Sequence, residues 1–255
     1  MLRIVKTRIN QKYRTMAYPD GPPPELPARF VGRPVVSHAT CKRGCDLCIS
    51  VCPVNAIHRS HETGGPVIDT GRCIFCRACE GACPNGAIHF SREYRLASSP
   101  RRELYVQAGS PDHAPARHDL AVRIFGRSLK LRQVSAGGCN ACEADSNVLG
   151  TLAWDMGRFG IQFVASPRHA DGLLITGPVT ENMRLALEKT YAAVPEPKIV
   201  IAVGACAISG GIYMDHPEQH NGVMDIVPVD LFIPGCPPHP LTILDGLLRF
   251  IGRIG

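Results

Sequence analysis

Hydrophobic and polar residues are arranged in two different ways along the chain, and the arrangement changes near residue 128. Beyond that point, short apolar runs predict strands, and longer runs with apolar residues three or four positions apart predict helices. The expected strands cover 128–134, 161–165, 172–176, 198–203 and 229–233, and the expected helices cover 145–159, 181–193 and 241–254. Strands alternating with helices are typical of a mostly parallel sheet with helices on both faces. We therefore expect a doubly wound α/β domain over 128–255.

The first 127 residues lack this alternation and divide into three stretches. Residues 1–37 form a basic, proline-rich arm, in which the run Pro19–Pro24 cannot continue a helix. Residues 38–97 contain eight of the twelve cysteines and form the expected second domain. Residues 98–127 are polar, rich in Pro, Arg and His, and are expected to be a linker.

The start of the arm concentrates positive charge. Five basic residues precede the first acidic residue: Arg3, Lys6, Arg8, Lys12 and Arg14. Apolar residues, Leu2, Ile4, Val5 and Ile9, are interleaved with them. The pattern fits a segment at a membrane surface. It also fits a basic arm that is either solvated or packed on a partner subunit. We favour this second interpretation because the apolar stripe is short.

Composition narrows the class of protein. Hydrophobic residues make up 45% of the 255 residues and charged residues 20%, the balance of a folded chain. No run approaches the roughly 18 apolar residues of a membrane-spanning helix, and no secretory signal precedes the arm. We expect a cytoplasmic protein. The formal charge of +6 is spread along the chain without a nucleic-acid-binding motif, so no nucleic acid partner is expected.

Twelve cysteines in a reducing compartment indicate metal or redox chemistry rather than disulfides. Four of them, Cys73, Cys76, Cys79 and Cys83 before Pro84, follow the C-x2-C-x2-C-x3-C-P spacing of bacterial ferredoxins. In that spacing three thiolates bind one 4Fe-4S cluster and the fourth binds another. Zinc is the alternative for C-x2-C pairs, but zinc has no use for three thiolates in seven residues followed by Cys-Pro.

A second run has the same plan with one extra residue: Cys41, Cys45, Cys48 and Cys52 before Pro53. The run after Pro53 matches the run after Pro84, which indicates an internal repeat. The ferredoxin crossing rule then assigns Cys41, Cys45, Cys48 and Cys83 to cluster 1, and Cys52, Cys73, Cys76 and Cys79 to cluster 2. The expected fold here is an α+β, ferredoxin-like domain.

The other four cysteines each follow an expected strand, in turns rich in Gly or Pro: Cys139, Cys142, Cys206 and Cys236. The carboxyl ends of parallel strands meet at one edge, where cofactors bind, so the four are expected to hold a third 4Fe-4S cluster. Buried thiols that merely fill a core are the alternative.

These motifs carry a family resemblance. Residues 128–255 resemble the small subunit of group 4 nickel-iron hydrogenases, including formate hydrogenlyase, and the related 20 kDa, B-type cluster-bearing subunit of respiratory complex I. The spacing of Cys139 and Cys142 favours the hydrogenases, because the complex I relatives have adjacent cysteines there. Residues 1 to about 105 resemble the two-cluster ferredoxin subunit of the same complexes, including the entry Leu26–Pro34. The resemblance implies a fusion of two subunits, the second flavodoxin-like.

The resemblance also implies partners and a role. A separate large subunit holds a nickel-iron centre or a quinone site, and this chain relays electrons to or from it as part of an oxidoreductase. Further expected partners are membrane subunits and an electron-donor or acceptor module of ferredoxin or formate dehydrogenase type. The chain is expected at the cytoplasmic face of the inner membrane. The alternatives are a relay subunit of a nickel-free, complex I-like quinone oxidoreductase and a free-standing polyferredoxin.

A few further residues lie beside the expected ligands. Glu143 is a candidate for proton transfer near the third cluster, although we favour a first-turn carboxylate at a helix start, and Asp145 is interpreted in the same way. His239 is interpreted as a helix-entry or subunit-contact residue rather than one that couples protons to the cluster. The loop 204–211 lacks a phosphate-binding pattern, so no nucleotide site is expected.

Overall fold

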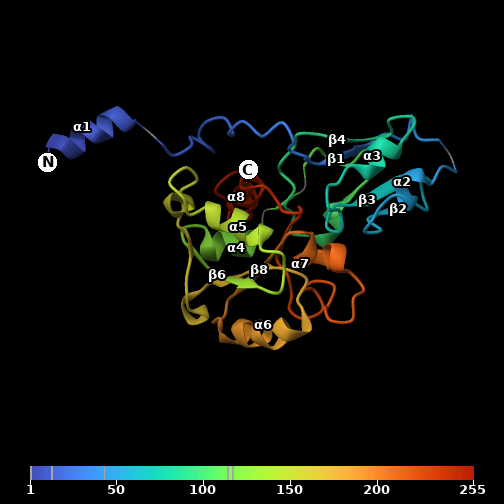
Figure 1. The fold of residues 1–255 in the computed structure, drawn as a ribbon. Helices are drawn as coiled ribbons and strands as arrows, with labels where there is room; N and C mark the ends of the chain where they lie inside the picture. The colour runs from blue at the N-terminus through green and yellow to red at the C-terminus, as the bar shows by residue number, and fades with distance from the viewer. Residues whose placement is uncertain (1, 13, 43, 114, 117) are drawn as a thin grey trace.

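The protein has an α+β N-terminal half and an α/β C-terminal half (Figure 1). The structure, a computed structural model, describes residues 2–12, 14–42, 44–113, 115–116 and 118–255. The N-terminal half is small and irregular, whereas the C-terminal half is built on one continuous sheet. Both expected fold classes are confirmed.

Five parallel strands form the C-terminal sheet. In spatial order they are β10 (Leu231–Ile233), β9 (Ile199–Val203), β8 (Gly172–Thr176), β6 (Leu129–Ser135) and β7 (Ile161–Phe163). All four neighbouring pairs run parallel. If the five strands are numbered 1 to 5 by their order in the chain, their order across the sheet from the β7 edge is 2-1-3-4-5, the flavodoxin-like arrangement. Its switch point, where ligand sites form in such folds, lies between β6 and β8.

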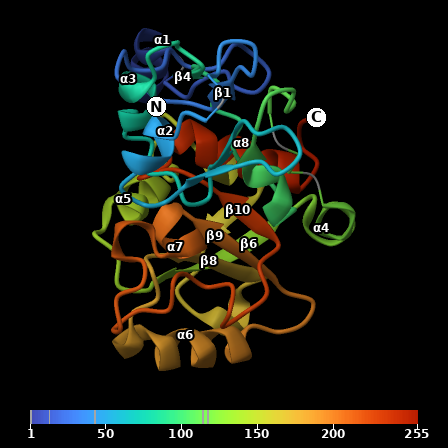
Figure 2. The same ribbon diagram turned by 90° about the vertical axis from the view of Figure 1, so that its right-hand side faces the viewer.

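Helices cover both faces of this sheet (Figure 2). They are α4 (Asp119–Phe125), α5 (Ala141–Val148), α6 (Glu181–Ala193), α7 (Ala205–Ser209) and α8 (Pro240–Phe250), with short 3₁₀ turns η2 (Met156–Phe159), η3 (Pro167–His169) and η4 (Gly211–Tyr213). Successive strand residues point to opposite faces. Leu174 therefore packs in the layer beneath α8, while Leu173 and Ile175 pack in the layer that contains Leu187 of α6.

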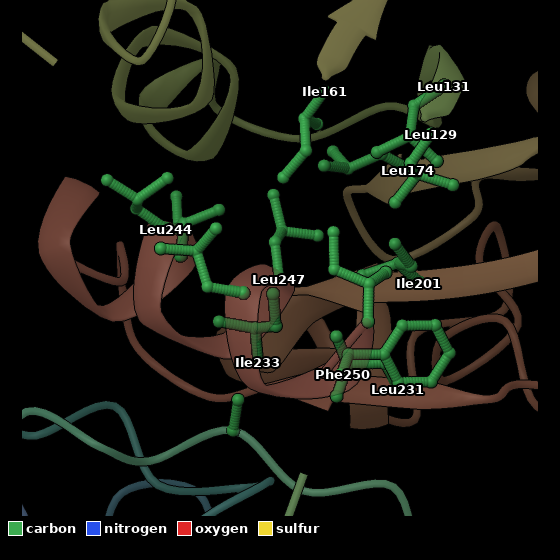
Figure 3. Close-up of a cluster of buried hydrophobic side chains, with 14 of the residues drawn as sticks. Leu129, Leu131, Ile161, Leu174, Ile201, Leu231, Ile233, Leu244, Leu247 and Phe250 are labelled. Carbon is green, nitrogen blue, oxygen red and sulfur yellow. The ribbon is translucent and has the colours of Figure 1, made fainter. Parts of the chain in front are cut away.

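The layer beneath α8 is the larger core (Figure 3). Ten of its side chains are Leu129, Leu131, Ile161, Leu174, Ile201, Leu231, Ile233, Leu244, Leu247 and Phe250. Every residue of α8 is buried, because the N-terminal half covers the side of the helix that faces away from the sheet. Tyr18 of the arm donates a hydrogen bond from its hydroxyl to Asp245 Oδ1 of α8, at 2.8 Å.

One expected helix, 145–159, is wrong. The helix begins earlier and ends at Val148, and a separate 3₁₀ turn follows at Met156. The chain doubles back between them, since the Met156 amide donates to the Leu149 carbonyl at 3.0 Å and both side chains are buried. The other expected elements of this half match observed ones to within a few residues at their ends, whereas α7 lies in a segment that was expected to be a turn.

The N-terminal half contains two small antiparallel sheets. One pairs β1 (Pro34–Val36) with β4 (Ile88–Phe90), and the other has the order β2 (Ile57–Arg59), β3 (Pro66–Asp69) and β5 (Tyr105–Val106). Two short helices, α2 (Leu47–Ser50) and α3 (Ala78–Ala82), carry cysteines of the two runs. The repeat in the sequence is visible in the fold, because β2 and β4 each begin five residues after the cysteine of a Cys-Pro pair.

The segment 98–127, expected as a linker, contributes to both halves. It contains η1 (Arg101–Leu104), the sheet strand β5, and α4 beside the larger core. At its start Ser98 forms an antiparallel bridge with Phe232 of β10, so the two halves share backbone hydrogen bonds. The chain begins with α1 (Leu2–Gln11). Within the described ranges, no helix has the length and apolar character needed to cross a bilayer.

Candidate functional site

The two Cys-Pro turns hold their sulfurs in the same way. The amide of Ala56 donates to Cys52 Sγ, and the amide of Ala87 donates to Cys83 Sγ, both at 3.2 Å. Each donor lies four residues after its cysteine, at matching positions of the repeat. Amide hydrogen bonds to a sulfur favour its thiolate form and are one way in which a protein sets a cluster's potential.

Eight cysteines gather around two small cavities in the N-terminal half. The first is lined by Cys41, Cys45, Cys48 and Cys83, together with apolar side chains that include Leu47 and Ile88. The second is lined by Cys52, Cys73, Cys76 and Cys79, with Ile68 and Phe90 among its apolar neighbours. Each cavity thus takes three cysteines from one run and one from the other, the same two sets that the crossing rule predicts.

The third set comes from three separate loops at the carboxyl edge of the parallel sheet. Cys139 follows β6, Cys142 lies in α5, Cys206 lies in α7 after β9, and Cys236 follows β10. The loops after β9 and β10 are joined by backbone bonds, Gly204 N to Ile233 O and Ala205 N to Gly235 O, both 2.8 Å.

Glycine is required where two of these loops meet. Gly204 has a φ of +89°, and a Cβ added there would lie 2.5 Å from Cys142 Sγ. The loop after β9 therefore approaches Cys142 as closely as a bare backbone allows. The sites of Cys142 and Cys206, 64 residues apart in sequence, adjoin at this point.

Burial and mutual repulsion act on the thiols. Burial, and after it the charges of Cys206, Glu143, Cys236 and Cys139, raise the pKa of Cys142. Burial and then the neighbouring Cys236 and Cys139 raise the pKa of Cys206 to about 11. These four thiols are therefore within electrostatic reach of one another. Without bound cations Cys142 and Cys206 are protonated at neutral pH.

The pKa values of the N-terminal thiols shift in two directions. Burial raises the pKa of Cys73 to about 12, even though the amide of Phe75 donates to its sulfur. Burial and then Cys52 raise the pKa of Cys79 to about 11. At Cys83 burial acts in the same direction, but the amides of the turn outweigh it, so its pKa is lowered.

The donor set suits a polynuclear iron-sulfur group. The described residues contain no group of three or more His, Cys, Asp or Glu side chains arranged to hold a single metal ion. In a 4Fe-4S cluster each of four thiolates binds a different iron, and the sulfurs surround the group instead of meeting at one point. Four cysteines around an apolar cavity with amide donors match that requirement.

Glu143 lies directly behind the third set, at the switch point between β6 and β8. Its side chain is buried, and its Oε1 accepts hydrogen bonds from Ser135 Oγ and Thr176 Oγ1, both at 2.6 Å. Because Ser135 ends β6 and Thr176 ends β8, the carboxylate ties α5 to both strands. This geometry supports a structural role for Glu143 at the start of α5, and proton transfer by it stays a hypothesis.

Asp145 and His239 line one pocket together with Cys236, Phe75 and Thr242. Burial raises the pKa of Asp145 and lowers the pKa of His239. The Nδ1 of His239 accepts a hydrogen bond from the Leu241 amide at 3.1 Å, which caps α8. His239 is thus a helix-entry residue, as its position between two prolines suggests.

The second and third cysteine sets adjoin across the junction of the halves. Ser209 Oγ of α7 shares its proton between the carbonyl of Gly71 at 3.2 Å, two residues before Cys73, and the carbonyl of Ala205 in its own helix at 3.1 Å. A Cβ on Gly71 would lie 2.9 Å from Ile208. From the loop after Cys206, Met214 packs against the buried group that contains Cys73. Sequence reasoning missed these contacts, because residues far apart in sequence leave no local signal of their pairing.

The fold and its cysteines define a class: a two-cluster ferredoxin-type domain joined to a flavodoxin-like domain with cysteines at the sheet edge. Comparison with known families matches residues 35–93 to the 4Fe-4S dicluster domain. Residues 139–250 match the family described as NADH ubiquinone oxidoreductase, 20 Kd subunit. Through its C-terminal half the chain belongs to this 20 Kd subunit family.

Curated relatives match about half of this chain. A probable membrane-bound hydrogenase subunit of Pyrococcus furiosus is 43% identical over 52% of this chain and 79% of its own length. Formate hydrogenlyase subunit 7 of Escherichia coli is 47% identical, and the match spans half of each protein. An NADH-quinone oxidoreductase subunit of Geotalea uraniireducens is 44% identical over 46% of this chain and 69% of its own length.

Proposed function

We propose that this chain is the electron-relay subunit of a membrane-associated complex of the group 4 nickel-iron hydrogenase type, similar to formate hydrogenlyase. The observation that carries this proposal is the gathering of eight cysteines around two pockets, with the other four within electrostatic reach of one another at the sheet edge and close to the second pocket across the domain junction. A carrier with one redox site has no need of such a series. Family membership and the hydrogenase and quinone oxidoreductase relatives support the same class.

The three sets are proposed as ligands of three 4Fe-4S clusters. Cys41, Cys45, Cys48 and Cys83 would hold cluster 1, and Cys52, Cys73, Cys76 and Cys79 would hold cluster 2. Cys139, Cys142, Cys206 and Cys236 would hold cluster 3. When bound, such clusters supply one-electron transfer over a wide range of potentials.

The chain's own residues hold this series in a fixed order. Cys48 and Cys52 pack around Cys79 in one small core, which joins the first two sets. The hydrogen bond from Ser209 to Gly71 and the packing of Met214 on Cys73 join the second and third. The amides of Ala56, Ala87 and Phe75 stabilise the sulfurs, and apolar side chains line the two N-terminal cavities. We propose the order cluster 1, cluster 2, cluster 3.

The partners follow from the absence of any spare cysteine. With all twelve assigned, none is left for nickel, so the substrate-converting centre belongs to a separate large subunit next to the third set. Membrane subunits and a donor or acceptor module, of ferredoxin or formate dehydrogenase type, complete the proposed complex. The proposed location is the cytoplasmic face of the inner membrane.

Anaerobic purification of the native assembly, with metal analysis and hydrogen-dependent dye reduction, tests the function. We expect about twelve irons per copy of this chain, together with nickel and hydrogen uptake. The same iron content with neither nickel nor activity would favour a nickel-free quinone oxidoreductase instead. A monodisperse free chain that retains all its iron would favour a polyferredoxin.

Two serine variants test the crossed ligand sets. Cys83→Ser should perturb the electron paramagnetic resonance signal of cluster 1, although Cys83 lies in the second run of cysteines. Cys52→Ser should perturb cluster 2. If each variant instead perturbs the cluster of its own run, the two sets have been assigned wrongly.

A further inference from the structure

Helix α1 is amphipathic and carries only positive charge. Leu2, Val5 and Ile9 recur at the spacing of one helical face, and their side chains are 88%, 53% and 68% exposed. The basic residues of α1 and of the short segment after it are Arg3, Lys6, Arg8, Lys12 and Arg14. The first acidic residue of the chain is Asp20. The helix thus presents an apolar stripe on a surface whose charges are all positive.

None of the described residues of α1 is buried against the rest of the chain. Figure 1 places α1 apart from both halves, at the end of the arm. Among the described residues of the arm, the first anchored to the body are Thr15, whose Oγ1 donates to the Leu152 carbonyl at 2.9 Å, and Met16, whose amide donates to the Ala153 carbonyl at 3.0 Å. Arg158 Nη1 also donates to the Met16 carbonyl at 2.8 Å. The body therefore fixes the base of the helix and leaves its length uncovered.

The surroundings of that base are also apolar and exposed. The side chain of Leu152, whose carbonyl receives the bond from Thr15, is 69% exposed. Leu152 thus adds an exposed apolar side chain at the place where the arm is anchored.

We propose that α1 lies in the surface of a membrane that contains anionic lipid and holds this chain there directly. A short helix with an apolar stripe and a basic polar face binds by burying the stripe at the headgroup level while its Lys and Arg side chains reach anionic headgroups. The exclusively positive charge selects lipid, because a bilayer supplies negative charge along the whole helix without a matched protein surface. Arg8 already bonds the Lys12 carbonyl, so Arg3, Lys6 and Lys12 are the charges on which the proposal relies.

This inference goes beyond the proposed relay function, since it needs no cluster and no large subunit. It also revises the interpretation that the sequence alone favoured, a solvated or partner-packed arm. The structure adds the information that decides the change: the apolar stripe is exposed, and the segment from Thr15 on is fixed on the body.

Vesicle flotation of the full, iron-loaded chain tests the proposal. Phosphatidylcholine vesicles with about 30% phosphatidylglycerol are compared with pure phosphatidylcholine. We expect binding to the anionic vesicles only, with protection of residues 2–11 from hydrogen exchange in their presence. A variant with Arg3→Gln, Lys6→Gln and Lys12→Gln should bind about 100-fold more weakly, at about fivefold per charge. A Val5→Ser, Ile9→Ser variant should also lose binding and the exchange protection.

Matched controls separate the helix from net charge and overall hydrophobicity. Lys130→Gln, Arg168→Gln and Lys189→Gln remove the same charge from exposed positions of the body, and Ile124→Ser with Leu185→Ser removes exposed apolar side chains elsewhere. Both controls should bind as the parent does. The proposal is overturned if the charge control loses as much binding as the α1 variant, or if the parent ignores anionic vesicles. Loss of copurifying membrane subunits in the α1 variants, without vesicle binding by the parent, would assign α1 to a protein partner.

Discussion

The two halves of the molecule are held together by different means. In the C-terminal half, two apolar layers on either side of a five-stranded sheet form the core, and the cysteines lie at the sheet edge. In the N-terminal half the strands are two to four residues long, and the buried groups are small. Cys73 and Cys79 are themselves members of those groups. The thiols thus line the edge of one core and constitute much of the other.

The difference teaches where the stability of each half comes from. A sheet with apolar side chains on both faces buries enough surface to fold without a cofactor. A domain with a few buried apolar residues around two cavities needs another source of stability, as small metal-binding domains do. The comparison therefore predicts that iron is structural in the N-terminal half and dispensable for folding in the C-terminal half.

Iron removal should have the largest effect and tests this contrast directly. Anaerobic chelation is expected to abolish hydrogen-exchange protection of β2 and β3, because it removes the proposed clusters that link the cysteines around each cavity. Strands β6, β8 and β9 should remain protected, since their hydrogen bonds lie between the two apolar layers. Peptide-resolved hydrogen exchange before and after chelation gives the measurement. Equal loss of protection in both halves would contradict the comparison.

The substitution Gly204→Ala should remove one cluster and leave the rest of the chain folded. At the φ of +89° and ψ of 156° of this residue the backbone is essentially restricted to glycine, and the new Cβ would meet Cys142 Sγ. We expect the iron content to fall by about four atoms per chain. Colorimetric iron analysis and electron paramagnetic resonance of the purified chain measure the loss.

Gly81→Ala is the matched control. Gly81 lies in α3 between Cys79 and Cys83, and a Cβ there meets no atom within 4 Å. Its iron content should equal that of the parent, and the helix should gain slightly in stability. Full iron in the Gly204 variant would show that the loop after β9 does not form part of a cluster site.

Most strands and helices of the α/β half could be predicted from the sequence, because the periodicity of hydrophobic residues indicates which side chains are buried. The strand 172–176 was placed within its observed bounds, as was the helix 181–193. The expected helix 145–159 failed for a tertiary reason. Leu149 and Met156 are both buried and are joined by a backbone hydrogen bond across a tight reversal, which a helical period cannot distinguish from a continuous helix.

The sequence could predict which cysteines share a site where those cysteines lie close together along the chain. Spacing alone sorted eight cysteines into the two sets that share cavities in the structure, while their binding of iron stays a prediction. The strand β5 was missed, because two residues in a polar segment carry no periodic signal and are fixed only by pairing with β3. The junction of Gly71 with Ser209 was invisible for the same reason.

Ion pairs provide a third and smaller test of the two halves. Asp69 accepts hydrogen bonds from the Gly71 amide at 2.9 Å and from Arg101 Nη2 at 2.6 Å, and its side chain is 4% exposed. Asp69→Asn leaves Arg101 largely buried without its charge partner, which should cost about 3 kcal/mol. Glu188→Gln breaks the exposed pair with Arg184 in α6 and should cost less than about 0.5 kcal/mol. Opening free energies from native-state hydrogen exchange give both values, and similar costs would show that Arg101 is solvated.

The smallest expected effect lies at the junction, where the two halves depend on each other. Ser209→Ala removes the hydroxyl that the Gly71 carbonyl shares with the Ala205 carbonyl of α7, so it should cost less than about 1 kcal/mol in the opening of the loop before Cys73. Ser50→Ala in α2 is the matched control, because that hydroxyl bonds only the Leu47 carbonyl of its own turn in an exposed position. Hydrogen exchange of the 69–73 amides should rise in the first variant and not in the second. If neither changes, apolar packing of Ile208 and Met214 alone holds the second and third cysteine sets together.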